Sequence, residues 1–180
     1  GYVEQILRQL DMMSGMTKEV LAFARGESDV LIRRVYMNRF SAEVKTQLKT
    51  SLANTQVTVD VVDEYKGVAH FDENKIMRIA HNMARNAASA IGNVPGTFKV
   101  VVRKDDTNLI LEFVDNGPGI PEHLEGRLFQ LFASGTEGGF GLGLAITKKI
   151  VDDHKGQISV ASTRGEGTCF RIELPQKTEE

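Results

Sequence analysis

Asp115-Asn116-Gly117-Pro118-Gly119-Ile120-Pro121 directly follows the apolar run Leu109–Val114 and is the strongest local signal in the chain. Two glycines and two prolines within seven residues specify a rigid turn at the end of a strand. The carboxylate of Asp115 can accept a hydrogen bond from an exocyclic amine, such as that of adenine. Taken alone, the motif is better explained as an ordinary Asp-Asn-Gly loop, so its meaning depends on the rest of the chain.

Downstream, Gly138-Gly139-Phe140-Gly141-Leu142-Gly143-Leu144 leads into a helix expected from about Leu142 to His154. Glycines let the backbone approach an anion closely, and a helix start adds free N–H groups and a positive dipole end. A flexible connector would have the same composition. The spacing matches neither the Walker A loop nor G-x-G-x-x-G.

Upstream, Asp72 is expected to cap a long helix that runs to about Ile91, with Gly92 after its end. Asn82 and Asn86 lie four residues apart and therefore on one face of this helix. Asn86 lies at the shoulder of the apolar stripe, where an asparagine is usually just a polar rim residue. Its side-chain oxygen is also a suitable ligand for Mg²⁺, which shares its remaining positions with phosphates and water.

Three hairpins and further segments complete the expected fold, which is a two-layer α/β sandwich of a mixed, mostly antiparallel sheet with three helices on one face. The hairpins pair 56–62 with 67–71, 97–103 with 109–114, and 157–162 with 169–174. Residues 30–38 are expected to form a strand, and 41–52 a helix capped by Ser41. The last turn, 165–168, contains Gly-Glu-Gly-Thr and by itself is unremarkable.

Residues 2–26 have a heptad-like apolar stripe and are expected to form a helix in front of the sandwich. Either this helix packs on its own core or it is half of a helical hairpin whose partner is missing. Because the chain begins inside the helical pattern, we expect an excised fragment. The expected division is 1–26 for the second, truncated helix of the hairpin and 27–180 for the main domain.

The composition is that of a soluble globular protein, with 41% hydrophobic and 26% charged residues among 180. A formal net charge of −2 provides no basic field for nucleic acid or an anionic membrane. The single Cys169 excludes an internal disulfide. No apolar run approaches the roughly 20 residues of a membrane span, and there is no signal-peptide pattern, so a cytoplasmic location is expected.

The motifs in this order resemble the boxes of one family. Asn82 to Ala87 resembles the N box, Asp115–Gly119 the G1 box, and Leu128–Phe132 the F box. Gly139–Leu144 resembles the G2 box and Gly165–Thr168 the last glycine box. Together they resemble the catalytic domain of sensor histidine kinases, within the superfamily that includes gyrase, Hsp90 and MutL ATPases, over residues from about 30 to 175.

The resemblance implies Mg-ATP as the ligand and Asn86 as the catalytic residue that holds the metal. It implies that Asp115 reads the adenine amine with support from Thr168, that glycine N–H groups face the phosphates, and that Phe132 anchors one end of a lid. The implied nucleotide-binding residues are Asn82, Arg85, Asn86, Asp115, Gly117, Gly119, Ile120, Phe132, Gly139, Gly141, Leu142, Gly143, Leu144 and Thr168.

Three features depart from the family pattern. Ser89 replaces a residue that is often basic, Phe140 occupies a site that is usually small, and the lid 133–140 has no lysine or arginine. The phosphate charge would then be balanced by Mg²⁺ and the helix dipole, with Arg85 as a further candidate, although a solvent-facing arginine is the better explanation of Arg85.

Asn82 bears on the choice between kinase and hydrolase. The resemblance implies that members of the superfamily that hydrolyse ATP carry a glutamate at this position, which serves as the base for water. An asparagine cannot accept a proton near neutral pH. This favours a kinase over an ATP-driven clamp. A module that binds nucleotide or protein without catalysis is a third interpretation.

The family implies phosphoryl transfer to a histidine that is followed by an acidic residue. None of the four histidines, at 70, 81, 123 and 154, precedes one. The acceptor is therefore expected on a hairpin helix outside this chain, which should not phosphorylate itself. The implied partners are that hairpin, the receiver domain of a response regulator, and a second copy in a homodimeric parent protein.

Overall fold

The computed structural model describes residues 6, 17, 30–124, 126–133 and 141–176. Its elements in chain order are β1 (Arg33–Tyr36), α2 (Met37–Ser51), β2 (Val57–Asp63), β3 (Val68–Phe71), α3 (Glu73–Ile91), β4 (Gly96–Lys104), β5 (Asn108–Asp115), the 3-10 helix η1 (Glu122–Leu124), α4 (Gly143–Asp153), β6 (Gln157–Thr163) and β7 (Gly167–Pro175). Most of the helix expected over residues 2–26 lies outside the described part, where only Ile6 and Thr17 are recorded, both helical.

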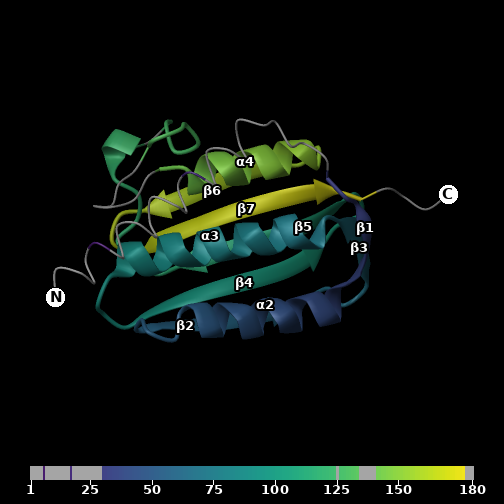
Figure 1. Cartoon of the computed structure of the whole chain (residues 1–180), viewed down its shortest axis with the longest axis horizontal. Helices are drawn as coiled ribbons and strands as arrows, with labels where there is room; N and C mark the ends of the chain where they lie inside the picture. The colour runs from purple at the N-terminus through teal and green to yellow at the C-terminus, as the bar shows by residue number, and fades with distance from the viewer. Residues whose placement is uncertain (1–5, 7–16, 18–29, 125, 134–140, 177–180) are drawn as a thin grey trace.

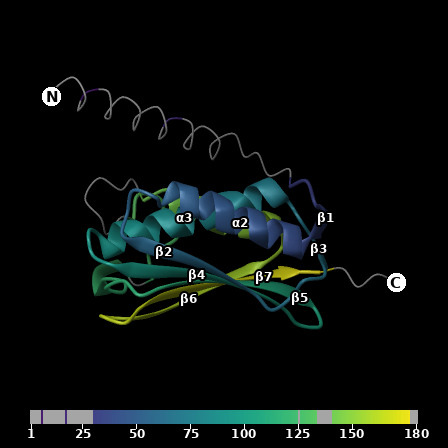
Figure 2. The ribbon, with the colours of Figure 1, turned by 90° about the horizontal axis from the view of Figure 1, so that it is seen from below.

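A five-stranded sheet in the order β2-β4-β5-β7-β6 forms one layer, and α2, α3 and α4 cover one of its faces (Figures 1 and 2). Only the β2–β4 pair is parallel within this sheet, and the other three pairs are antiparallel. The predicted two-layer, mostly antiparallel sandwich is confirmed. Strands β1 and β3 form a separate two-stranded sheet at one end of the molecule (Figure 1).

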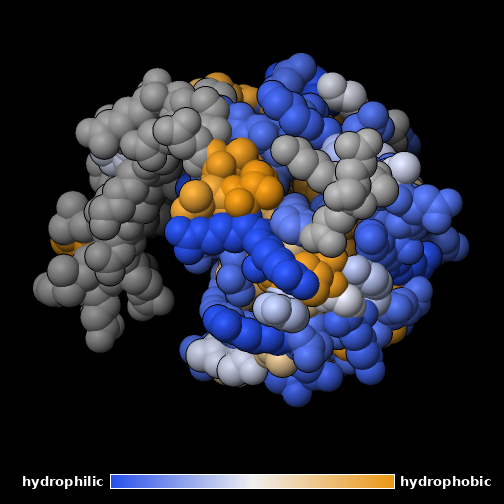
Figure 3. Space-filling model, turned by 90° about the vertical axis from the view of Figure 1, so that its right-hand side faces the viewer, coloured by the Kyte–Doolittle hydropathy of each residue, from blue (hydrophilic) through white to orange (hydrophobic). Residues whose placement is uncertain are grey.

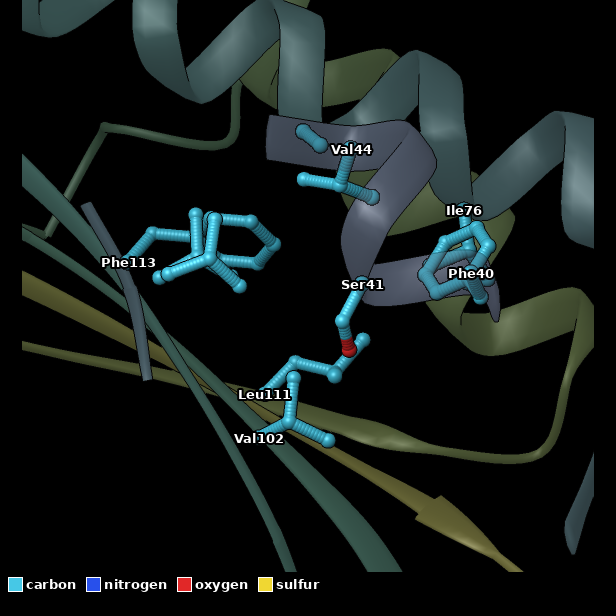
Figure 4. Close-up of a pocket in the computed structure, with 10 residues that line it drawn as sticks. Phe40, Ser41, Val44, Ile76, Val102, Leu111 and Phe113 are labelled. Atoms are coloured by element: carbon cyan, nitrogen blue, oxygen red, sulfur yellow. The ribbon is translucent and has the colours of Figure 1, made fainter. Parts of the chain in front are cut away.

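The core lies between the helices and the sheet. Phe98 of β4 and Phe113 of β5 stack with ring centroids 6.3 Å apart, and both are almost fully buried. Burial of side chains of this size contributes roughly 1.5–3 kcal/mol each relative to exposure. A small internal cavity remains between α2, α3 and the sheet, and its lining includes Val44, Ile76 and Val102 (Figure 4).

The expected hairpin between 56–62 and 67–71 is wrong. β2 pairs in parallel with β4, with Val57 opposite Gly96, while β3 pairs with β1, with Phe71 opposite Arg33. The physical reason is that α3 connects β3 to β4 and buries its apolar face against the sheet, which places β2 beside β4 as in a crossover connection. Alternating β-branched residues indicate a strand but do not identify its partner.

The first strand and the first helix also differ from expectation. β1 is shorter than the predicted strand 30–38, and α2 begins at Met37 instead of being capped by Ser41. Met37, Phe40 and Val44 are buried at helical spacing, so tertiary burial extends the helix N-terminally. The Ser41 hydroxyl instead donates to Asp63 Oδ1 at 3.1 Å.

Other local predictions are confirmed. Asp72 caps α3, and its Oδ1 accepts a hydrogen bond from the Lys75 N–H at 3.1 Å. Gly92 follows the helix with a φ of 72°, which favours glycine. The hairpins β4–β5 and β6–β7 form as expected, as does the helix α4. Within the described residues, no helix is both long and apolar enough to span a membrane.

Candidate nucleotide-binding site

The candidate site lies at the end of the sheet opposite β1 and β3 (Figure 1). It is formed by the end of β5, the second half of α3, the start of α4 and the turn between β6 and β7. These segments come from distant parts of the sequence, and each carries one of the predicted motifs.

Asp115 is the last residue of β5 and is half-buried. Its Oδ1 accepts a hydrogen bond from the Gly117 N–H at 2.8 Å, and the N–H of Thr168, its partner across β5 and β7, also donates to the carboxylate. Burial raises the pKa of Asp115, although these two backbone donors oppose the rise. The carboxylate is thus held in a fixed orientation at the end of the central strand.

The turn after Asp115 packs on the β6–β7 turn. The Ile120 N–H donates to Ser162 Oγ at 2.9 Å, and the Gly165 N–H donates to the Pro118 carbonyl at 2.9 Å. Gly119 has a φ of 81°, and a Cβ there would lie 2.7 Å from the Thr163 carbonyl oxygen. Only glycine fits this position, which explains the sequence motif.

Ser162 was not predicted as a site residue. Besides receiving the Ile120 N–H, its hydroxyl donates to the Gly167 carbonyl at 3.1 Å and lies 3.2 Å from Thr168 Oγ1. Thr168 is buried and lies opposite Ser162 in the β6–β7 register. The sequence could have identified Ser162, because the correctly predicted hairpin places it opposite Thr168.

The aspartate turn also contacts the last turn of α3. A Cβ built on Gly117 would lie 3.4 Å from Ile91 Cγ1 and 3.8 Å from Ala90 Cβ. Asn86 lies one helical turn before Ala90 and is exposed. The structure therefore brings the helix that carries Asn86 against the turn that follows Asp115.

The start of α4 contacts the same helix one turn earlier. Asn82 is only 4% exposed, and its Nδ2 donates to the Gly143 carbonyl at 3.3 Å. Arg85 Nη2 donates to Asn82 Oδ1 at 2.8 Å. Leu142 and Leu144, two predicted nucleotide contacts, pack in the core cluster, the first fully buried and the second in part.

The two ends of the predicted lid are joined. The Phe132 N–H donates to the Gly141 carbonyl at 3.1 Å, and the Phe132 side chain is 64% exposed. Gly141 has a φ of 64°, and a Cβ there would lie 2.6 Å from the Ala133 backbone. The predicted contact Gly139 and the residue Phe140 lie outside the described part.

The residue types at this end of the sheet are compatible with a nucleotide that carries Mg²⁺. Within the described ranges, no group of three or more His, Cys, Asp or Glu residues could hold a metal ion. The amide oxygen of Asn86 is a hard neutral ligand, which suits Mg²⁺ when phosphates provide most of the coordination. Arg85 is a cation on the same helix, and through Asn82 it is linked to the N-terminus of α4.

Residues 71–178 match the model of a protein family described as histidine kinase-, DNA gyrase B-, and HSP90-like ATPase. Over 177 residues the chain is 25% identical to Sporulation kinase A of Bacillus subtilis (strain 168), which covers 98% of this chain and 29% of that protein. Over 132 residues it is 35% identical to the sensory histidine kinase/phosphatase NtrB of Escherichia coli O157:H7, which covers 68% of this chain and 37% of NtrB. The chain therefore spans less than two fifths of these curated relatives.

Solved structures show the same fold. The nucleotide-free catalytic domain of histidine kinase ThkA superposes with a TM-score of 0.71 at 25% identity, covering 81% of this chain and 98% of that one. ThkA in complex with the response regulator protein TrrA gives a TM-score of 0.79 at 24% identity, covering 98% of this chain and 51% of that one.

Proposed function

This chain belongs to the histidine kinase-, DNA gyrase B- and HSP90-like ATPase family, and on that premise we propose that it is the Mg-ATP-binding catalytic domain of a sensor histidine kinase. It is homologous to the catalytic domains of such kinases. The observation that carries the proposal is that the turn after Asp115 packs against the last turn of α3, while the start of α4 packs against the middle of the same helix.

Asp115 would bind the adenine end of the nucleotide. Its carboxylate accepts hydrogen bonds and is oriented by the N–H groups of Gly117 and Thr168. An exocyclic amine is the complementary donor. Gly119 and Ile120 pack against the β6–β7 turn, and this packing would give the adenine ring a rigid surface to bind against.

The α3 and α4 helices would bind the phosphate end. Asn86 would supply an oxygen ligand to Mg²⁺, Arg85 would supply positive charge, and the free N–H groups near Gly141 and Gly143 would face phosphate oxygens. Bound Mg²⁺ neutralises phosphate charge as the γ-phosphoryl group is transferred. Catalysis by the protein is then mainly positioning and electrostatic stabilisation.

The acceptor would be a histidine on a hairpin helix of the same or a partner protomer. Its imidazole nitrogen forms a bond to the γ-phosphorus while the bond from that phosphorus to the β–γ bridging oxygen breaks, and ADP leaves. Asn82 offers no base to activate water, which supports transfer to a protein over hydrolysis. Residues 1–26 would belong to the hairpin of a homodimeric parent protein, and a response regulator would receive the phosphoryl group from it.

The test is to compare the wild-type chain with Asn86→Ala and with Asn74→Ala, a matched exposed asparagine on the same helix. Calorimetry with a non-hydrolysable ATP analogue should show Mg-dependent binding for the wild type and the control, and its loss for Asn86→Ala. Adding a hairpin with an acceptor histidine and γ-labelled ATP should give an acid-labile label on the hairpin. If the wild type binds no adenine nucleotide, the proposal fails.

Binding without transfer to any hairpin would instead identify a regulatory nucleotide-binding module. Release of inorganic phosphate without a labelled protein would identify a hydrolase.

A further inference from the structure

We propose that Asn82 is a positioning residue that fixes the first residue of α4 and the guanidinium of Arg85 relative to α3, and does not itself contact the nucleotide. The expected effect on nucleotide binding rests on the proposed function, but the contact between Asn82 and Gly143 can be tested in the nucleotide-free protein.

Burial and hydrogen bonding separate Asn82 from Asn86, although both lie on α3. Asn82 is 4% exposed, whereas Asn86 is exposed. Both ends of the Asn82 amide are occupied, with Nδ2 donating to the Gly143 carbonyl at 3.3 Å and Oδ1 accepting from Arg85 at 2.8 Å. An amide oriented in this way by its own protein is a structural link between two helices.

Gly143 packs directly on this amide. A Cβ added to Gly143 would lie 3.7 Å from Asn82 Cγ, which is ordinary van der Waals contact. Since Gly143 is the first residue of α4, the link acts at the turn where the helix presents its free N–H groups.

Thr147, one turn further along α4, supports this interpretation. A helical threonine hydroxyl commonly bonds the carbonyl four residues earlier, which here belongs to Gly143. That carbonyl accepts the Asn82 amide, and the fully buried Thr147 Oγ1 has no hydrogen-bond partner in the described part of the chain. The donor that α4 would otherwise provide for itself comes from α3.

The two helices are joined at a second place as well. The Asp72 N–H, at the start of α3, donates to Nε2 of His154, which follows the last residue of α4, at 3.0 Å. α4 is thus held against α3 at both of its ends. The Asn82 end is the one that faces the proposed phosphate position, so its loss should affect phosphate binding more than adenine binding.

The first experiment uses the nucleotide-free chain and NMR. The side-chain amide protons of Asn82 should exchange with solvent at least about tenfold more slowly than those of exposed Asn86, because one of them is buried in a hydrogen bond. In Asn82→Leu, the backbone amide signals of Gly143 and Leu144 should shift without any ligand. Equal exchange of the two asparagines would overturn the proposal.

The second experiment measures affinity. Asn82→Leu should weaken binding of a Mg-ATP analogue by roughly tenfold, the scale of one buried hydrogen bond, while adenosine binding changes less than about twofold. A loss of adenosine binding equal to that of the ATP analogue would contradict a role at α4.

The third experiment is a double-mutant cycle with Thr147→Val. In the wild type this substitution should leave affinity for the ATP analogue unchanged, because the hydroxyl has no partner there. In Asn82→Leu the Thr147 hydroxyl can replace the lost donor to Gly143, so Thr147→Val should weaken binding further. Additive effects would count against the shared carbonyl.

These outcomes remain separable from failure of the proposed function. If the wild type binds no nucleotide, the exchange and chemical-shift measurements still decide whether Asn82 links the helices. If Asn82→Leu does not fold, the exchange of the wild-type Asn82 amide protons alone decides it.

Discussion

At the scale of single residues, Asp115 combines partial burial with two backbone hydrogen bonds, and burial dominates, which raises its pKa. The adenine amine donates a hydrogen bond, and the ionised carboxylate is a stronger acceptor than the protonated carboxyl group. We therefore predict that affinity for adenosine declines on acidification at a higher pH than an ordinary aspartate would cause. Calorimetric titration from neutral to acidic pH checks this.

Asp115→Asn is the matched variant for that measurement. It should bind adenosine more weakly near neutral pH, by about tenfold or more, since a buried charge-assisted hydrogen bond is replaced by a neutral one. Its affinity should also lose the acidic decline. A decline that persists unchanged in the variant would assign the pH dependence to another group.

His154 gives a second pH dependence, this time of folding. Its buried ring accepts from the Asp72 N–H at Nε2 and bonds the Ile150 carbonyl through Nδ1 at 2.7 Å, so only the neutral ring satisfies both contacts. Burial lowers the pKa of His154, although the Ile150 carbonyl and the charges of Asp72 and Asp153 oppose this while Lys75 adds to it.

Because the unfolded histidine takes up a proton near its ordinary pKa of about 6.5, before the folded one does, stability should be full above that pH and fall as the pH decreases toward the lowered pKa. Denaturant midpoints at about pH 7.5 and about pH 5.5 measure the loss. His154→Gln should be less stable overall and lose less on acidification, whereas the exposed control His123→Asn should behave like the wild type.

The residues that the sequence identified were those whose type is required by local geometry or charge. Asp72 as a cap and Gly119 in a strained turn follow from short stretches of chain. Ser162 and the packing of Asn82 on Gly143 do not, because each depends on contacts between segments that lie 42 and 61 positions apart. The roles of Asn82, Asn86 and Asp115 toward a nucleotide stay predictions.

At the scale of elements, Gln176 joins the two sheets. Its N–H donates to the Thr107 carbonyl at 2.7 Å, and its side-chain Oε1 accepts from the His70 N–H of β3 at 2.7 Å. The side-chain amide thus takes the place of a neighbouring strand at the edge of β3.

Gln176→Ala should lower the free energy of unfolding by about 1–2 kcal/mol, because it removes a side-chain acceptor from a backbone donor at a sheet edge. Chemical denaturation measures the change, with exposed Gln56→Ala as the control. A change within about 0.5 kcal/mol, the usual range for surface positions, would show that water replaces the side chain at no cost.

The same scale explains which pairings were predictable. β4–β5 and β6–β7 are neighbours in sequence joined by short turns, so alternation and turn residues suffice. The parallel β2–β4 pair and the β1–β3 pair require knowledge of where α2 and α3 pack. The predicted hairpin between 56–62 and 67–71 failed for that reason.

At the scale of the whole molecule, the two ends of the sandwich differ. The candidate nucleotide site occupies one end, and the other exposes the apolar side chains of Leu31, Ile32 and Tyr36 beside or within β1. Figure 3, which faces that end, shows a compact hydrophobic patch among hydrophilic side chains. The internal cavity lies between them in the core and is lined by none of the proposed nucleotide contacts.

Val44→Ile adds one methylene group toward this cavity and should raise the free energy of unfolding by about 0.5–1 kcal/mol. Affinity for the ATP analogue should not change. Val35→Ile, at a buried position that does not line the cavity, is the control and should be destabilising because the added group has no space. Equal destabilisation by both substitutions would show that the cavity cannot accept the group.

The hydrogen bond from Phe132 to Gly141 has a consequence for how relatives of this domain can diversify. This bond joins the residues on either side of the lid sequence, so the distance between the two ends of the lid is fixed by the rest of the fold. Closing a longer loop costs little more than closing a short one. Lids of different length and charge should therefore be interchangeable without loss of stability. A chimera that received a basic lid between Ala133 and Gly141 should keep its melting temperature and bind the ATP analogue more tightly.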